Sequence, residues 1–144
     1  MINYDNLLLV HLLTCFTLLG LILTIQFVHY PSFLFVSKNR FLEFENFHTR
    51  RISLIVMPLM MIEFISGLLL LIETNAKNDF IILINFMLLT MTWLSTFFLS
   101  VPIHRKLSQR YNSEDIYYLI KTNWPRTIFW SLRSVLLIIL FQMS

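Results

Sequence analysis

Glycine, cysteine and acidic residues are all scarce in this sequence. Its 144 residues include two Gly, one Cys and eight Asp or Glu. A single cysteine cannot form an intramolecular disulfide, so we expect Cys15 to be a small packing residue rather than a redox centre. The sequence has no Gly-rich phosphate-binding loop and no HExxH or CxxC motif. These absences exclude several common kinds of enzyme site.

Apolar residues are abundant instead and make up 57% of the chain. A bilayer core about 30 Å thick needs about 20 apolar residues per helix. Such stretches are typical of a membrane protein rather than a soluble domain, and the first is too long for a signal-peptide core. We therefore predict an all-α fold, an integral membrane four-helix bundle in up-down-up-down order. The four spans of this single domain, residues 1–144, are expected at 7–30, 52–72, 80–101 and 124–143.

Basic residues are concentrated at one end of the predicted bundle. An even number of spans places both termini and the turn at 73–79 on one side, where Lys77 is the only basic residue. The other side carries Lys38, Arg40, Arg50, Arg51, Arg105, Lys106, Arg110, Lys121 and Arg126. The positive-inside rule then predicts that this side faces the cytoplasm and that both termini lie outside, in the inner membrane of a bacterium.

The same charges indicate which partners to expect. They flank spans rather than cover a soluble domain, so we expect contact with bilayer lipids and no nucleic acid. A homo-oligomer is compatible with the sequence. On the cytoplasmic side we predict short interfacial helices, one starting near Ser37 ahead of the second span and one starting near Ser113.

One acidic and one basic residue lie inside the predicted spans at matching depth. Glu63 is about midway through the second span, and Arg133 is in the middle of the fourth. An unpaired charge at that depth costs several kcal/mol, about 2.5 to 3.5 kcal/mol at least for Arg, so we predict that the two side chains pair. The pair could hold two helices in register, or it could take part in catalysis by moving or balancing a proton.

Three of the four histidines fall at the cytoplasmic end, each from a different span. These are His29, His48 and His104, whereas His11 lies on the opposite side, where we expect a local hydrogen bond. Three imidazoles at one level could hold a transition metal, and two could ligate haem iron. Interfacial histidines can equally well do no more than hydrogen-bond lipid head groups.

Further polar residues surround these histidines at helical spacing. Gln26 and Tyr30 are next to His29, and at 100° per residue four residues share one face of the fourth span. Those four are Asn123, Arg126, Trp130 and Arg133. We predict a polar cavity that opens to the cytoplasm, with Arg126 steering an anionic group. The predicted substrate-binding residues are Gln26, Tyr30, Asn123 and Trp130.

Three short segments carry a family resemblance. QFVHYPSF ends the first span, VPIHRKL ends the third, and NWPRTIFWSLR opens the fourth. In this order they resemble the small four-helix membrane proteins of the anthrone-oxygenase-like group. The resemblance implies a membrane-embedded oxidoreductase that acts on a lipophilic aromatic or quinone-like molecule, and it assigns no residue a role.

Two classes of function therefore remain open at the level of sequence. In the first, the protein is a metal- or haem-dependent oxidoreductase with Glu63, Arg126 and Arg133 as catalytic residues and His29, His48 and His104 as metal ligands. In the second, it is a non-catalytic membrane subunit or a small transporter whose buried charges are structural.

Overall fold

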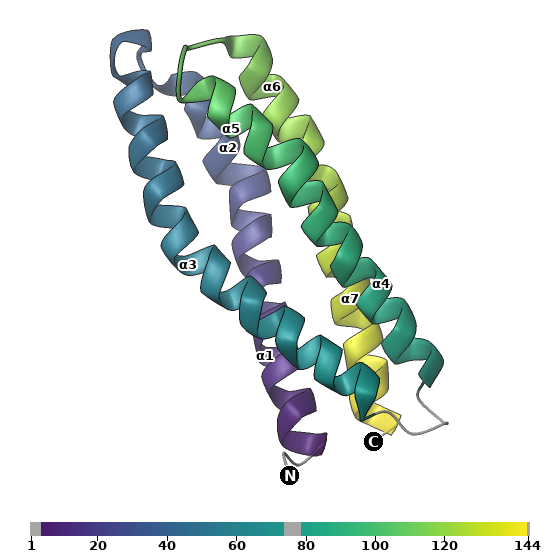
Figure 1. Ribbon diagram of the computed structural model, residues 1–144. Coiled ribbons are helices and arrows are strands. Elements are labelled where there is room, and N and C mark those ends of the chain that lie inside the picture. Colours follow the sequence, from purple (N-terminus) through teal and green to yellow (C-terminus); the bar gives the residue numbers. More distant parts are fainter. Residues whose placement is uncertain (1–3, 74–78, 144) are drawn as a thin grey trace.

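Helices account for all regular secondary structure in residues 4–73 and 79–143, the part of the chain that the computed structural model describes. Residues 74–78 of the predicted turn, with Lys77, and the ends of the chain at 1–3 and 144 lie outside the described residues. The prediction of an all-α chain is confirmed over the described ranges. Figure 1 shows the helices arranged as four long rods.

The four rods follow one another along the chain. The first contains α1 (Tyr4–Thr24), the π-helical turn η1 (Ile25–His29), the short helix α2 (Tyr30–Ser32) and the 3-10 turn η2 (Phe33–Phe35). The second is α3 (Lys38–Ile72), and the third is α4 (Asp79–Ser95), the π-helical turn η3 (Thr96–Ser100) and α5 (Val101–Leu107). The fourth contains α6 (Ser113–Thr122) and α7 (Trp124–Met143). Each rod is long and apolar enough to cross a membrane, which suggests an integral membrane protein.

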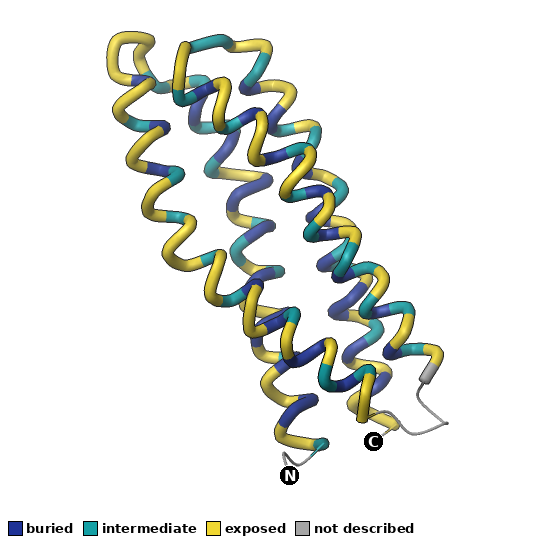
Figure 2. The backbone as a smooth tube through the Cα atoms, in the orientation of Figure 1, coloured by how far each residue is buried: buried dark blue, intermediate teal, exposed yellow. Residues whose placement is uncertain are grey.

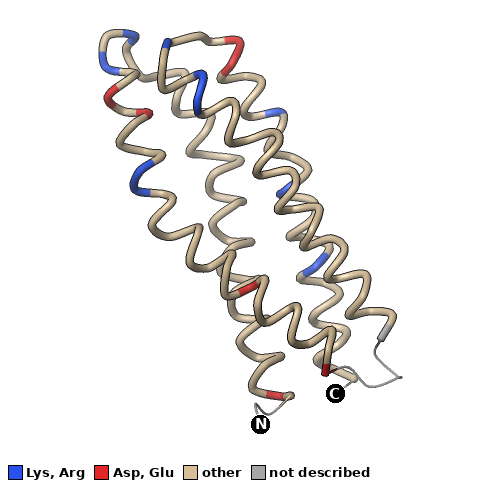
Figure 3. Tube along the Cα trace, viewed as in Figure 1, with Lys and Arg blue, Asp and Glu red and all other residues tan. Residues whose placement is uncertain are grey.

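The rods pack side by side around a shared interior. α1 packs against α3 and α7, and α4 packs against α7 and α3. The first residues of α1 and the last of α7 lie at one end of the bundle, while α2, α5 and α6 lie at the other (Figure 1). We call the second end the α6 end. Most Lys and Arg residues are found toward the α6 end, as Figure 3 shows.

Apolar side chains cover much of the outside of the rods, and many polar ones lie inside. Leu54, Ile65 and Phe98 are each more than half exposed. Figure 2 shows buried positions on the inner faces of the rods and exposed positions on the outer faces. Exposed apolar surface on this scale is unfavourable in water but suits contact with lipid. The polar interior is therefore the place to search for a site.

A proline follows each of the two π-helical turns. Pro31 comes just after η1, and Pro102 comes just after η3. Proline has no N–H, and its ring clashes with the carbonyl four residues earlier, so a local widening of the helix accommodates it. The N–H of Tyr30 then bonds to the carbonyl of Ile25, five residues back, and Val101 bonds to Thr96 in the same way. Both turns lie at the α6 end of the polar interior and change the direction of the side chains that follow.

Candidate functional site

The predicted pair of Glu63 and Arg133 is confirmed. Arg133 Nη1 donates to Glu63 Oε1 at 2.8 Å, and both side chains are fully buried. The indole N–H of Trp130 donates to the same carboxylate, 3.1 Å from Oε1 and 3.2 Å from Oε2. The pair therefore joins α3 to α7 in the interior. The free-energy cost of burying a carboxylate that has two donors is far smaller than that of burying an unpaired one.

Polar residues from α1 and α4 complete this network. The Nε atom of Arg133 donates to Asn85 Oδ1 at 3.3 Å, and the Asn85 amide donates back to the Arg133 carbonyl at 3.2 Å. His11 lies between the helices, with Nδ1 2.8 Å from Ser66 Oγ and Nε2 3.4 Å from Arg133 Nη2. His11 Nε2 also lies 3.2 Å from Asn85 Oδ1, so His11 of α1 contacts α3, α4 and α7, which is more than the local hydrogen bond predicted for it.

The absence of a side chain at Gly67 makes room for the His11 ring. A Cβ atom at Gly67 would lie 2.9 Å from His11 Cε1 and 3.0 Å from a methyl carbon of Leu89. Contacts that short do not occur between carbon atoms without displacement, so a side chain would have to move. Gly67 therefore permits close approach between α1 and α3, and the group that approaches it is an imidazole.

A second polar cluster lies toward the α6 end. His104 Nδ1 is 2.6 Å from Glu45 Oε1, and His104 Nε2 is 2.9 Å from the hydroxyl of Tyr30. A carboxylate only accepts hydrogen bonds, so we assign the donor to Nδ1, and in the neutral ring Nε2 accepts from Tyr30. Glu45 is fully buried. The three side chains form a continuous chain from α3 through α5 to α2.

The other two histidines pair with each other beside this chain. His29 Nε2 lies 2.7 Å from His48 Nδ1, and the centroids of the His48 and His104 rings are 5.4 Å apart. His48 Nε2 and Glu45 Oε2 are both buried and have no hydrogen-bond partner among the described residues. The structure thus brings together the three histidines that the sequence placed at one level.

Arg126, near the start of α7 in the fourth rod, extends its side chain toward these groups. Its Nη2 donates to the Tyr30 hydroxyl at 3.4 Å, and its Nη1 donates to Thr96 Oγ1 at 3.5 Å. Both Nε, at 3.0 Å, and Nη2 donate to Asn123 Oδ1. Asn123 in turn donates to Gln26 Oε1 at 2.8 Å. The guanidinium of Arg126 is thereby fixed in a buried position by side chains from three rods.

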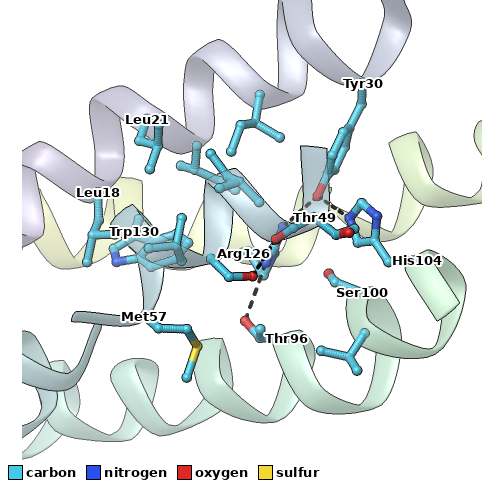
Figure 4. Close-up of a pocket in the computed structure, with 16 residues that line it drawn as sticks. Leu18, Leu21, Tyr30, Thr49, Met57, Thr96, Ser100, His104, Arg126 and Trp130 are labelled. Atoms are coloured by element: carbon cyan, nitrogen blue, oxygen red, sulfur yellow. Dashed lines mark hydrogen bonds between the residues drawn. The ribbon is translucent and has the colours of Figure 1, made fainter. Parts of the chain in front are cut away.

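A cavity of about 240 Å³ lies directly beside Arg126. Figure 4 shows Tyr30, His104 and Arg126 grouped at one end of this cavity, with Thr96 nearby. Most of the remaining wall is apolar and includes Leu18, Leu21, Ile22, Ile25, Val56 and Met57. Trp130 also lines the wall and links the cavity to the Glu63 carboxylate. The cavity is thus amphipathic, with a cationic and hydrogen-bonding end.

The predicted site residues divide into three groups in the structure. Tyr30, His104, Arg126 and Trp130 line the cavity, whereas Gln26 and Asn123 are placed behind Arg126 and hold it. Glu63 and Arg133 lie beyond Trp130 and do not line it. His29 and His48 line a separate groove between α1 and α3. The wall of the predicted polar cavity is therefore mostly apolar, with Arg126 as the one cation among the described residues that line it and with Tyr30 and His104 beside it.

Sequence reasoning did not identify Glu45, Asn85 or the depth of His11. Glu45 lies three residues before His48 on one helix, so their shared face was a usable signal. Asn85 is one uncharged residue in an apolar span, and such residues often hydrogen-bond across helices. Neither signal names a partner without the arrangement of the rods.

No group of three or more His, Cys, Asp or Glu among the described residues is arranged to hold a metal ion. The close approach of His29 to His48, and of His104 to Glu45, uses nitrogen atoms that a metal would need as ligands. The prediction of a metal or haem therefore gains no support from the geometry.

The fold and site define an all-α chain with four apolar rods, a buried ion pair and an amphipathic cavity. Comparison with known proteins adds nothing to this description, since no protein-family model, curated protein or solved structure matches the chain. The resemblance to the anthrone-oxygenase-like group stays a prediction.

Proposed function

We propose that this is a membrane protein that binds a lipophilic molecule whose head group carries a hydrogen-bonding oxygen, such as an aromatic phenol or a quinone-like ring in its quinol form. The observation that supports the proposal is the cavity of about 240 Å³ whose apolar walls end at Arg126, Tyr30 and His104. This volume is slightly below the roughly 300 to 1,000 Å³ range of small-molecule sites, which favours a small ligand.

Arg126 supplies the selectivity for an acidic or oxygen-bearing head group. Its guanidinium is buried, it cannot lose its proton, and it lines the cavity beside two further hydrogen-bonding groups. A charge-assisted hydrogen bond to a ligand oxygen is stronger in such an apolar environment than in water. The apolar walls would contact the rest of the ligand, whose burial provides most of the affinity.

Tyr30, His104 and Glu45 give the site a means of acid–base chemistry. Tyr30 can give its hydroxyl proton to His104 Nε2, and Glu45 orients the imidazole through Nδ1. A phenol or quinol bound against Arg126 could then pass its own proton to Tyr30. This chemistry is compatible with the predicted oxidoreductase, which would also need an electron acceptor.

The same proposal assigns a supporting role to the buried ion pair of Glu63 and Arg133. Glu63 and Arg133 are saturated with partners and reach the cavity only through Trp130. We propose that they fix the position of Trp130 in the wall. This closed network also favours the second class of function, a non-catalytic subunit or small transporter whose buried charges are structural.

The orientation in the membrane is part of the proposal. The four rods cross the bilayer in up-down-up-down order, with both termini outside the cytoplasm. The α6 end, with most of the Lys and Arg residues, then faces the cytoplasm, in the inner membrane of a bacterium.

Binding of an alkyl nitrophenol tests the proposed ligand class. The absorbance of this probe distinguishes phenol from phenolate, so one titration of purified protein gives both the affinity and the ionisation of the bound head group. Arg126→Gln should weaken binding at least about tenfold and decrease the phenolate fraction, because one charge-assisted contact is lost. Arg126→Lys keeps the charge, and Arg105→Gln removes an exposed one as a matched control.

The outcomes separate the two classes of function. Saturable binding that depends on Arg126 but not on Arg105 supports a ligand site. Binding that is equal in all variants contradicts it and favours the structural subunit. Metal analysis and a visible absorption spectrum of the same sample test the metal or haem prediction, which a stoichiometric metal or a haem band would support.

A further inference from the structure

A second groove lies between α1 and α3, directly next to the cavity. It has a volume of about 310 Å³, and its walls include Thr24, Phe44, Phe47 and Ile55. Three of its lining residues, Leu21, Ile25 and Ile52, also line the cavity. The two spaces are therefore separated by a partition that is one layer of aliphatic side chains thick.

The groove has the same distribution of chemistry as the cavity. Its walls are mostly apolar, and it is lined by one guanidinium, that of Arg51, together with His29 and His48. Arg51 is exposed, and its Cζ lies 5.6 Å from the centroid of the Phe47 ring, a cation–π contact that holds it at the groove. None of the ion pairs among the described residues includes Arg51.

The surroundings of the groove indicate where a ligand would come from. Phe47 and Ile55 are more than half exposed on the outer face of α3, within a rod long and apolar enough to cross a membrane. A lipophilic molecule partitions into the bilayer and would reach this face sideways from the lipid. Arg51 follows Arg50 directly in α3, and a long exposed arginine at the α6 end of a spanning rod is suited to reach lipid head groups.

We propose that the groove between α1 and α3 is the entry site for the ligand of the cavity, with Arg51 receiving its acidic head group from the membrane before Arg126 binds it. This inference rests on the proposed function, because the two spaces must accept the same molecule. Leu21, Ile25 and Ile52 form the partition through which the molecule passes. The partition consists of aliphatic side chains, which can change rotamer far faster than a helix can move.

An entry site has a kinetic signature that a final binding site lacks. A residue that contacts the ligand only in transit changes the association and dissociation rates by the same factor and leaves the dissociation constant unchanged. A residue of the final site changes the dissociation constant, mostly through the dissociation rate. Arg51 should show the first behaviour, and Arg126 should show the second.

Stopped-flow mixing of the alkyl nitrophenol with purified protein in lipid nanodiscs tests the proposal. Arg51→Gln should slow association and dissociation equally, by about tenfold, as expected when a charged group that attracts the ligand is removed. Arg50→Gln is the matched control, because Arg50 is the adjacent exposed arginine and does not line the groove. Its rates should equal those of the unmodified protein.

A second pair of variants tests the partition. Ile52→Ala should accelerate association, and it should accelerate dissociation more strongly because Ile52 also lines the cavity, whereas Ile55→Ala, which lines only the groove, should leave both rates nearly unchanged. Thermal unfolding of every variant shows that each one is folded. A change of dissociation constant in Arg51→Gln without a change in association rate would overturn the entry site, and so would equal effects of Arg50→Gln and Arg51→Gln. Absence of any binding to the unmodified protein would instead refute the proposed function itself.

Discussion

Removing both members of the buried Glu63 and Arg133 ion pair should cost less stability than the two single removals added together. In Arg133→Leu the carboxylate of Glu63 loses its cationic partner and keeps only neutral donors such as the indole N–H of Trp130, and Asn85 loses the Nε donor at 3.3 Å. In Glu63→Gln the guanidinium is left without its carboxylate. Breaking a buried pair in this way costs about 3 to 5 kcal/mol of folding free energy, because one charge remains uncompensated.

The double variant separates pairing from other losses. Glu63→Gln together with Arg133→Leu buries no unpaired charge, so its loss should be smaller than the sum of the two single losses by roughly 0.5 to 3 kcal/mol. Reversible unfolding in mixed micelles with increasing SDS, followed by tryptophan fluorescence, measures each free energy. Glu73→Gln at the exposed end of α3 is the control and should change stability by less than about 0.5 kcal/mol. Losses that add within about 0.5 kcal/mol would refute the coupling.

Two further predictions concern helix packing and topology. Gly67→Ala should destabilise the protein by about 1 to 3 kcal/mol, because its Cβ would meet His11 at 2.9 Å. Gly20→Ala has nothing within 4 Å and should be neutral or stabilising by up to about 1 kcal/mol; the same unfolding assay compares the two, and equal effects would contradict the packing. A reporter fused after Ser144 should be active only outside the cytoplasm, and one inserted at Asn112 only inside. The reverse result would invert the proposed orientation.

The sequence alone was sufficient to predict the features that depend on the free energy of burying apolar and charged residues. The four apolar rods follow from hydropathy, and the pairing of Glu63 with Arg133 follows from the cost of an isolated charge in an apolar interior. Both statements need only the depth of a residue along a span. Neither needs the rotation of one helix relative to another.

The features that sequence missed depend on rotation and on local helix geometry. The predicted faces assumed 100° per residue, but η1 and η3 are π-helical turns, which shift every later side chain around the axis. Tyr30, the first residue after η1, lines the cavity, and His29, the last residue of η1, lines the groove. The two prolines were the only local sequence signal of this shift, because each π-helical turn comes just before a proline.

The two polar clusters differ in how completely their hydrogen bonds are satisfied, and this difference separates support from function. No buried side-chain polar atom of Glu63, Asn85 or Arg133 is without a partner in the described part of the chain, as expected of a network that holds helices together. The second polar cluster, toward the α6 end, leaves Glu45 Oε2 and His48 Nε2 without partners among the described residues. A buried unpaired polar atom costs about 1 to 3 kcal/mol, a cost that stability alone gives no reason to retain. Unsatisfied groups are expected where binding or proton transfer requires them, and His48 lines the groove next to the cavity, which is why we assign the chemistry to the α6 end.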